Sequence, residues 1–218
     1  LEAAELFNIS NGKFDLKLNL SFSSEGDSDV PFWQGETTFY QANARPLFLK
    51  EIPFQQIGGS ARFSKPEITL SSVTGLYHER IIRLEGLVLT EPEVYYDLNI
   101  EGLGLNAALL KEDLSLFTDE NYGFILEGEV GLSGNISGLP DSFYFKGEVN
   151  SAEIKIENTP FTNISGDFVL NNNGLTISEL ESGDSNGSIL INGELSWAQD
   201  IPSYQFIVKT PSLSLRHS

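Results

Sequence analysis

The sequence predicts a mostly β protein, an elongated antiparallel sheet built from two sequence repeats, with one or two short helices. Two observations carry this prediction. Residues 53–86 align without a gap with residues 160–193, at a constant offset of 107 positions. Short segments of alternating apolar residues, separated by turn-forming residues, also recur about every ten residues through the second half of the chain.

The two copies match at glycines and at apolar residues. The matched pairs are Phe54 and Phe161, Ile57 and Ile164, Gly59 and Gly166, Ile68 and Leu175, Leu70 and Ile177, Val73 and Leu180, Ile82 and Ile189, Leu84 and Ile191, and Gly86 and Gly193. None of these side chains suits acid–base or nucleophilic chemistry. The repeat therefore predicts a surface made by similar strands, in preference to a single catalytic point.

The elements before the first copy are a strand and a second short helix. Phe14, Leu16, Leu18 and Leu20 alternate with polar residues, which is the period of a half-buried strand. The second helix is expected over residues 1–7. In the first copy about five extra residues fall near 42–47, where we expect a loop or a β-bulge.

The main helix is predicted over residues 105–117. Leu105, Ala108, Leu109 and Leu116 fall on one stripe with a period of 3.6 residues. Strands follow wherever apolar residues alternate, around residues 154–156, 168–170, 175–177 and 189–197. Turns are predicted at residues 77–80, 138–141, 171–174 and 182–187 because these stretches are polar or rich in Asn, Gly and Ser.

These elements divide the chain into four parts. Residues 1–30 form an N-terminal strand region and residues 31–104 the first β repeat. Residues 105–127 form a connecting segment with the short helix, and residues 128–218 the second β repeat. No Pro-, Gly- or Ser-rich linker separates independent domains.

The composition excludes several classes of function. The net charge is −18 and the 13 basic residues are scattered singly, which argues against binding nucleic acid or an anionic membrane surface. Cysteine is absent, which excludes disulfides, thiol catalysis and Cys-ligated zinc. No apolar run is long enough to span a bilayer. The chain begins with Leu and contains no Met, so we expect a larger protein whose membrane anchor lies outside this sequence.

We expect no catalytic residue, no metal site and no cofactor, and hence no enzyme. His78 lies in a polar turn and has no second histidine with which to share a metal, while His217 is next to the C-terminus. The acidic run at residues 25–29 predicts a solvated loop. The segment after Asp184 resembles part of a calcium loop but lacks carboxylates at the first and twelfth positions.

The second copy resembles the repeats of a known family. Its pattern is Lys146-Gly147-Glu148-Val149, Ile154-x-Ile156, Thr159-Pro160-Phe161, Ile164-x-Gly166, Leu175-x-Ile177, a turn from Gly183 to Gly187, and Ile189-x-Ile191-x-Gly193-x-Leu195. This pattern is similar to the repeats of the AsmA-like superfamily, which includes TamB- and YhdP-type envelope proteins. The resemblance covers residues 31–209 and is closest over residues 128–197.

The resemblance implies a fold, a role and a location. Family members have an inner-membrane anchor followed by a long periplasmic sheet, which curls into a β-taco with an apolar groove. The implied function is a segment of a periplasmic bridge protein that conducts phospholipid between the inner and outer membranes of a diderm bacterium. Its partners would be phospholipid acyl chains, the inner-membrane anchor and an outer-membrane or envelope protein, the last two outside this fragment.

The residues expected to line the groove share one parity of apolar side chains in both copies. They are Phe63, Ile68, Leu70, Ile82, Leu84, Ile154, Ile156, Phe168, Leu170, Leu175, Ile177, Ile189, Ile191 and Leu195.

Two alternatives remain open. The same alternation would arise in a non-enzymatic structural or interaction repeat whose sheets pack on a closed, dry core. Exposed aromatic residues, namely Trp33, Trp197 and the pair Tyr95-Tyr96, could instead bind a carbohydrate.

Overall fold

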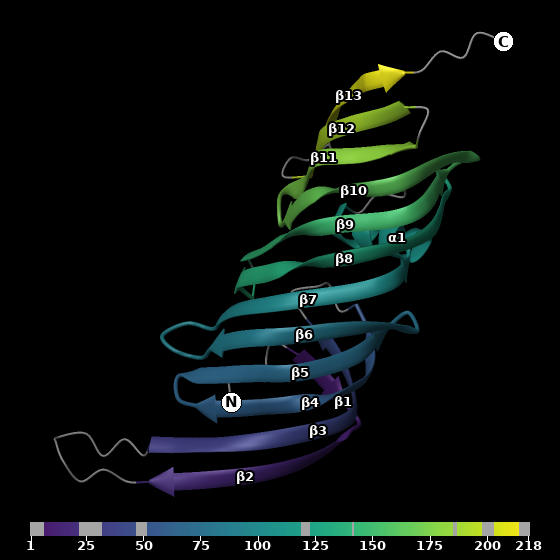
Figure 1. Ribbon diagram of the computed structural model, residues 1–218. Coiled ribbons are helices and arrows are strands. Elements are labelled where there is room, and N and C mark those ends of the chain that lie inside the picture. Colours follow the sequence, from purple (N-terminus) through teal and green to yellow (C-terminus); the bar gives the residue numbers. More distant parts are fainter. Residues whose placement is uncertain are drawn as a thin grey trace. The chain divides into compact units, whose positions relative to one another are not determined.

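The computed structural model describes residues 7–21, 32–46, 52–118, 123–140, 142–184, 187–197 and 203–213. Most of these residues lie in strands (Figure 1). The strands are β1 (Phe7–Ser10), β2 (Lys13–Ser21), β3 (Phe32–Pro46), β4 (Phe54–Ser64), β5 (Glu67–Tyr77), β6 (Arg80–Leu89), β7 (Tyr95–Asn106), β8 (Leu126–Leu139), β9 (Ser142–Ile156), β10 (Thr159–Asn171), β11 (Gly174–Asp184), β12 (Gly187–Ser196) and β13 (Ser203–Leu213). One helix, α1 (Ala107–Thr118), occurs in the described ranges.

The described strands form one antiparallel sheet, which does not close into a barrel over the described residues. From β3 to β13 each strand neighbours the next strand in the sequence, while β1 and β2 both pair with β3. The prediction of a mostly β, antiparallel protein is therefore confirmed. Within the described residues, α1 is too short and too polar to cross a membrane.

The predicted helix is confirmed, with a shift at its start. Leu105 and Asn106 belong to β7, and the helix begins at Ala107. The side-chain oxygen of Asn106 accepts hydrogen bonds from the backbone N–H groups of Ala108 (2.9 Å) and Leu109 (3.4 Å). Asn106 therefore caps the first turn, where backbone donors lack partners within the helix. Of the second expected helix, only Phe7 is described, and it begins β1.

The chain forms two compact units. Unit 1 comprises residues 1–100 and 136–143, and unit 2 comprises residues 101–135 and 144–218. Unit 1 contains the most deeply buried side chains among the described residues, Tyr96, Leu98 and Ile136, each less than 2% exposed. The Tyr96 hydroxyl donates a hydrogen bond to the carbonyl of Leu139 at 3.0 Å, so its polar end is satisfied inside this cluster.

In unit 1 the strand register gathers apolar residues on one face. Phe63 of β4 lies opposite Gly35 of β3 and Ile68 of β5. Ile68 lies opposite Val88 of β6, and Gly35 lies opposite Leu18 of β2. Directly opposed residues of antiparallel strands point to the same side of the sheet. This row of side chains therefore crosses five strands on a single face.

The other face of unit 1 is polar where β3, β4 and β5 pair. Glu36, Arg62 and Thr69 lie opposite one another on β3, β4 and β5. The guanidinium of Arg62 pairs with the carboxylate of Glu36 at 2.9 Å, and both side chains are more than half exposed. Such an exposed ion pair contributes little to the free energy of unfolding, but its charged groups remain hydrated on this face.

Unit 2 has the same two-faced arrangement. One row runs from Gly147 of β9 through Phe168, Ile177 and Gly193 to Phe206 of β13. On the opposite side, Glu148 lies opposite Asp167, which lies opposite Ser178, and Thr176 lies opposite Glu194. Charged residues thus gather on one side of β9–β13 and most large apolar residues on the other, although Val169, Leu190 and Ile207 share the side of the charged residues.

The expectation of a loop or a β-bulge near residues 42–47 is met by a β-bulge in β3. The register with β4 shifts on both sides of Ala42, and Gln41 has a φ of 53°. One expectation about turns is corrected. The predicted turn at 182–187 starts too early, because Ser182 to Asp184 belong to β11. Ser182 is buried, and its hydroxyl donates to the carbonyl of Thr162 at 3.0 Å, which anchors this strand end to β10.

A methyl group at Gly147 should destabilise the sheet. A Cβ at this position would collide with the backbone oxygen of Ser133 and lie 3.1 Å from the Phe168 ring. We expect Gly147→Ala to lower the free energy of unfolding by about 1–3 kcal/mol, the usual cost of overpacking. Gly123→Ala is the matched control, since its Cβ meets nothing within 4 Å. Equal midpoints for both variants in urea unfolding would contradict this.

Candidate functional site

The candidate site is the apolar face of each unit. In unit 2 the register places on one face Phe145, Gly147, Val149, Ile164, Gly166, Phe168, Leu170, Leu175, Ile177, Leu180, Ile189, Ile191, Gly193, Leu195, Tyr204, Phe206 and Val208. This set is the apolar face of unit 2. Between β11 and β12 the register shifts between Ile177 and Leu180, and this bulge keeps both side chains on the same face.

Most side chains on the apolar face of unit 2 are only half-buried. Ile164 and Phe168 are its buried members, at 7% and 8% exposure. On β13, exposure rises to 77% for Tyr204, 50% for Phe206 and 60% for Val208. Two sheets packed face to face would bury such positions almost completely. The described residues of unit 2 therefore leave much of this face accessible.

Aromatic rings lie over glycines on these faces. At Gly147 a Cβ would be 3.1 Å from Cζ of Phe168, and a Cβ at Gly193 or Gly35 would collide with the rings of Phe206 and Phe63. Each of these rings therefore covers backbone on a neighbouring strand instead of standing clear of the sheet. The ring of Phe168 also meets Phe145 edge-on, with centroids 5.0 Å apart and planes at 88° (favourable aromatic geometry). The resulting face is made mostly of apolar side chains, with no charged residue among the members named above.

The apolar face of unit 1 opens in a similar way toward β2. Phe14, Leu16 and Leu18 lie opposite Phe39, Thr37 and Gly35 of β3, and their side chains are 70%, 52% and 48% exposed. The expected lining residues of this unit are half-buried; they are Phe63, Ile68, Leu70, Ile82 and Leu84. The register puts all of them on the apolar face, together with Val73 and Val88.

The structure thus brings most predicted lining residues together within their own units. Ile154 and Ile156 lie near the end of β9. Along most of β9 every second residue is half-buried, but between Ser151 and Ile154 two exposed residues intervene, so the alternation is interrupted there. Ile154 is half-buried and lies opposite Phe161, whereas Ile156 is 40% exposed. These two residues continue the face less regularly than the other twelve.

The sequence interpretation missed the edge strands as part of these faces. Tyr204, Phe206 and Val208 extend the apolar face of unit 2 onto β13. Their alternation is visible in the sequence, but β13 lies outside the repeated stretch. A search for alternation alone, without the repeat, would have included them.

Polar candidates do not assemble into a reactive site. His78 and Glu79 form the tight turn between β5 and β6, both with positive φ, and the His78 ring meets Tyr77 edge-on at 4.5 Å. The described residues hold no group of three His, Asp or Glu side chains suited to a metal ion. A depression of about 140 Å³ is lined by Glu127, Gly128, Glu153 and Lys155, and it lacks the apolar walls of a small-molecule pocket. His217 and the acidic run at 25–29 lie outside the described residues.

The aromatic residues considered for carbohydrate binding have structural partners. The indole N–H of Trp197 donates to the carbonyl of Asn172 at 2.7 Å and fastens the end of β12 to the β10–β11 turn. Tyr96 is 1% exposed, while its neighbour Tyr95 is 39% exposed. The side chain of Trp33 lies outside the described residues. No stacked pair of exposed rings that would suit a sugar forms from the described members of this group.

Comparison with models of protein families, with curated proteins and with solved structures gives no match.

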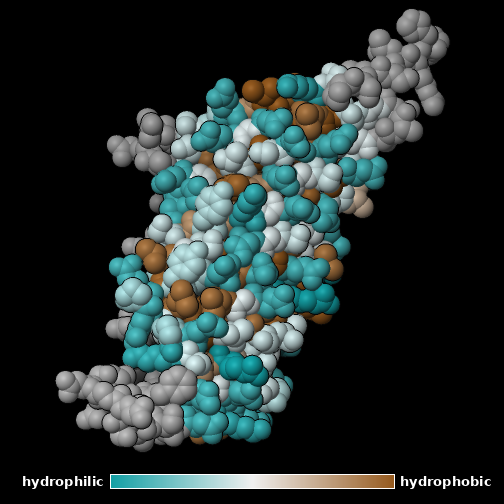
Figure 2. Space-filling model, turned by 60° about the vertical axis from the view of Figure 1, so that its left-hand side comes forward, coloured by the Kyte–Doolittle hydropathy of each residue, from teal (hydrophilic) through white to brown (hydrophobic). Residues whose placement is uncertain are grey.

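Hydrophilic and hydrophobic residues are mixed on the side of the molecule that Figure 2 shows. The side of the molecule shown in Figure 2 is mostly hydrophilic, with smaller hydrophobic clusters among the polar residues. Solvated charge on one side of a sheet keeps a protein in solution while the other side stays apolar.

An uncharged apolar dye should report the exposed face on β2. We expect replacement of Phe14, Leu16 and Leu18 by Ser to lower Nile red fluorescence, because these side chains are exposed on the apolar face. The free energy of unfolding should change by less than about 1.5 kcal/mol, as for three surface substitutions.

The matched control replaces Asp15, Lys17 and Asn19 by Ser, which changes the other face of the same strand. Dye fluorescence should be unaffected there. An equal loss of fluorescence in both triple variants would show that the dye does not bind the apolar face.

Proposed function

We propose that this chain is a segment of a periplasmic bridge protein that conducts phospholipid between inner and outer membranes, with acyl chains lying on its apolar faces. The observation that carries the proposal is a sheet face made mostly of half-buried apolar residues, such as Leu175, Ile177 and Ile191, with no charged residue among them. Removal of each methylene of an acyl chain from water onto such a face contributes about 0.8 kcal/mol. The resemblance to AsmA-like repeats supplies the cellular setting.

The dimensions of unit 2 suit one acyl chain. The row from Gly147 to Phe206 crosses five strands, β9 to β13. Adjacent strands are about 4.8 Å apart, so this row is about 19 Å long. One leaflet of a bilayer has about 15 Å of hydrocarbon, half of its roughly 30 Å core. A chain drawn from one leaflet could therefore lie along this row within a single unit.

A face dominated by apolar side chains holds acyl chains without fixing their position. Ile, Leu, Val and Phe side chains offer dispersion contacts, which do not depend on the position of a methylene along the chain. Bound acyl chains could slide along such a row without breaking hydrogen bonds. This property suits transport better than storage of one particular ligand.

The proposal includes a repeated and elongated architecture, curled around the groove. Strands β5 and β6 have the same lengths as β11 and β12, and their bounds differ by 107 residues throughout. The register shift between Leu70 and Val73 recurs at the same offset between Ile177 and Leu180. These coincidences support two copies of one structural unit.

Backbone geometry adds support for the two copies. Positive φ angles occur at Gln56 and Ser72, and again at Asn163 and Glu179. Each pair differs by 107 residues, although the side chains differ. A positive φ at a residue other than Gly destabilises the backbone, so its recurrence at the same offset indicates that the same bulge occurs in both copies.

The alternative is a structural or interaction repeat with a closed, dry core. The buried cluster of Tyr96, Leu98 and Ile136 in unit 1 favours it locally, because such packing excludes solvent. The half-buried faces elsewhere in each unit favour the lipid proposal. The lipid proposal and the closed-core alternative differ in whether lipid contacts the apolar face.

Photocrosslinking can test this contact residue by residue. A photoreactive amino acid at Leu175, on the apolar face, should crosslink to phospholipid when the protein is produced with its membrane partners in cells. The same amino acid at Thr176 should not, because Thr176 lies opposite Glu194 on the polar face of the same strand. Crosslinked lipid is detected by mass spectrometry of the purified protein.

Position 195 provides a second matched pair. Leu195 lies opposite Leu175, and its neighbour Glu194 lies opposite Thr176. Absence of lipid at both 175 and 195, with efficient crosslinking to a known lipid carrier in parallel, would exclude the proposal and leave the closed-core alternative.

A further inference from the structure

Unit 2 is strongly acidic. Its residues include 16 Asp and Glu and five Lys and Arg, so most of the charge of −18 belongs to this unit. Any ligand on its apolar face therefore lies in a negative potential. The positions of the few basic side chains determine whether an anionic group of such a ligand has a positive charge close to it.

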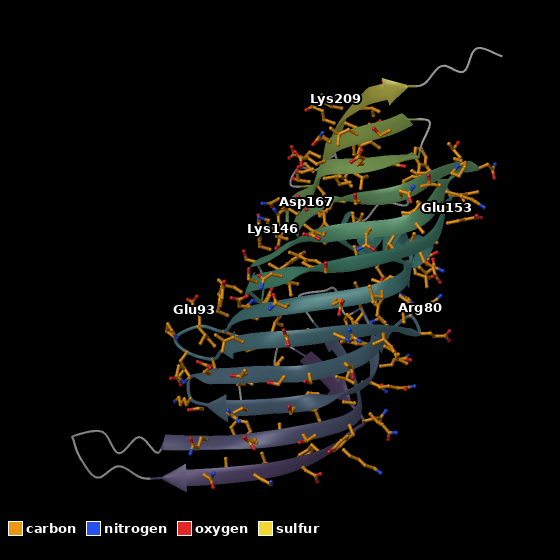
Figure 3. The ribbon with its side chains drawn as sticks, in the orientation of Figure 1. Arg80, Glu93, Lys146, Glu153, Asp167 and Lys209 are labelled. Carbon is orange, nitrogen blue, oxygen red and sulfur yellow. The ribbon has the colours of Figure 1, made fainter. Side chains whose placement is uncertain are left out.

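Two of the described lysines point away from the apolar face. Lys146 of β9 lies opposite Val169, and Lys209 of β13 lies opposite Leu190. Their neighbours in the chain, Phe145 and Val208, are on the apolar face, so alternation puts both lysines on the other side. Figure 3 labels Lys146 beside Asp167, which lies on the neighbouring strand of that same polar face.

The other two described lysines of unit 2 are engaged. The amine of Lys111 donates to the carbonyl of Phe124 at 2.6 Å and lies 5.2 Å from the centre of its ring. The amine of Lys155 lies 3.8 Å from the carboxylate of Glu153. None of the four described lysines of unit 2 therefore belongs to the set of side chains that forms its apolar face.

Resting on the proposed function, we infer that unit 2 selects phospholipids by the net charge of the headgroup, accepting zwitterionic lipids and disfavouring anionic ones. A phosphodiester at the margin of the apolar face finds no basic side chain there. A zwitterionic headgroup brings its own ammonium and keeps its net charge at zero. An anionic headgroup adds an uncompensated negative charge beside an acidic unit.

The expected preference is modest and sensitive to salt. Each carboxylate about 10 Å from an anionic headgroup in water weakens binding about twofold, so two or three together weaken it about four- to eightfold. At about 1 M salt the screening length falls to roughly 3 Å, and the preference should vanish.

The test uses the whole chain with a photoreactive residue at position 175, which reports on unit 2 alone. Phosphatidylcholine vesicles carry traces of phosphatidylethanolamine or phosphatidylglycerol with identical labelled acyl chains. At low salt we expect about fivefold more crosslinking to phosphatidylethanolamine than to phosphatidylglycerol, since few carboxylates act at close range.

Two lysine substitutions on β13 separate the effect of the face from that of total charge. Val208→Lys adds a cation to the apolar face, and Ile207→Lys adds one to the polar face of the same strand. The two positions are similarly exposed, at 60% and 52%, so both lysines can be solvated. We expect V208K to reduce the preference at least twofold and I207K to leave it nearly unchanged.

The outcomes distinguish this inference from the proposed function. Equal crosslinking to both lipids at low salt, or equal effects of V208K and I207K, would overturn headgroup selection while leaving lipid binding intact. No crosslinking to either lipid would instead overturn the proposed function itself.

Discussion

The register between neighbouring strands is the constraint on which the other features depend. A shift of one residue between two strands would move every apolar side chain of one strand to the opposite face. Phe168 lies opposite both Gly147 and Ile177, and the same register puts Asp167 opposite Glu148 and Ser178. One set of backbone hydrogen bonds therefore creates both the apolar face and the charged face.

An accessible apolar face needs protection against collapse and aggregation. In each unit the opposite face provides it, with charged side chains such as the pair of Arg62 and Glu36 in unit 1 and Glu148 and Asp167 in unit 2. Glycines contribute on the apolar side, because rings such as Phe206 cover the backbone at Gly193 and find contacts within the sheet. The apolar side chains of these faces are therefore mostly half-buried and not fully exposed.

Much of this arrangement was predictable from the sequence, for a physical reason. Alternation with period two is a property of each strand, and it placed Leu175 and Ile177 correctly on one face. The helix was also predicted, although Asn106 caps it two residues later than expected. The bulges within the repeat were not predictable from alternation, since Ser72 and Glu179 have positive φ without being Gly or Asn. Only contacts with neighbouring strands impose that geometry.

The edge strands explain why the candidate site extends further than the repeat. Tyr204, Phe206 and Val208 have one paired neighbour strand and no apolar layer above them among the described residues, so their exposure exceeds that of Ile189 or Ile191. A surface that binds acyl chains by dispersion and burial alone cannot discriminate between chains of similar length. If the apolar faces bind acyl chains as proposed, discrimination between lipids would come from the headgroup, on which charge acts without direct contact. An acidic unit whose sheet lysines Lys146 and Lys209 lie on the face opposite the apolar one would bind acyl chains of different lengths while disfavouring anionic headgroups.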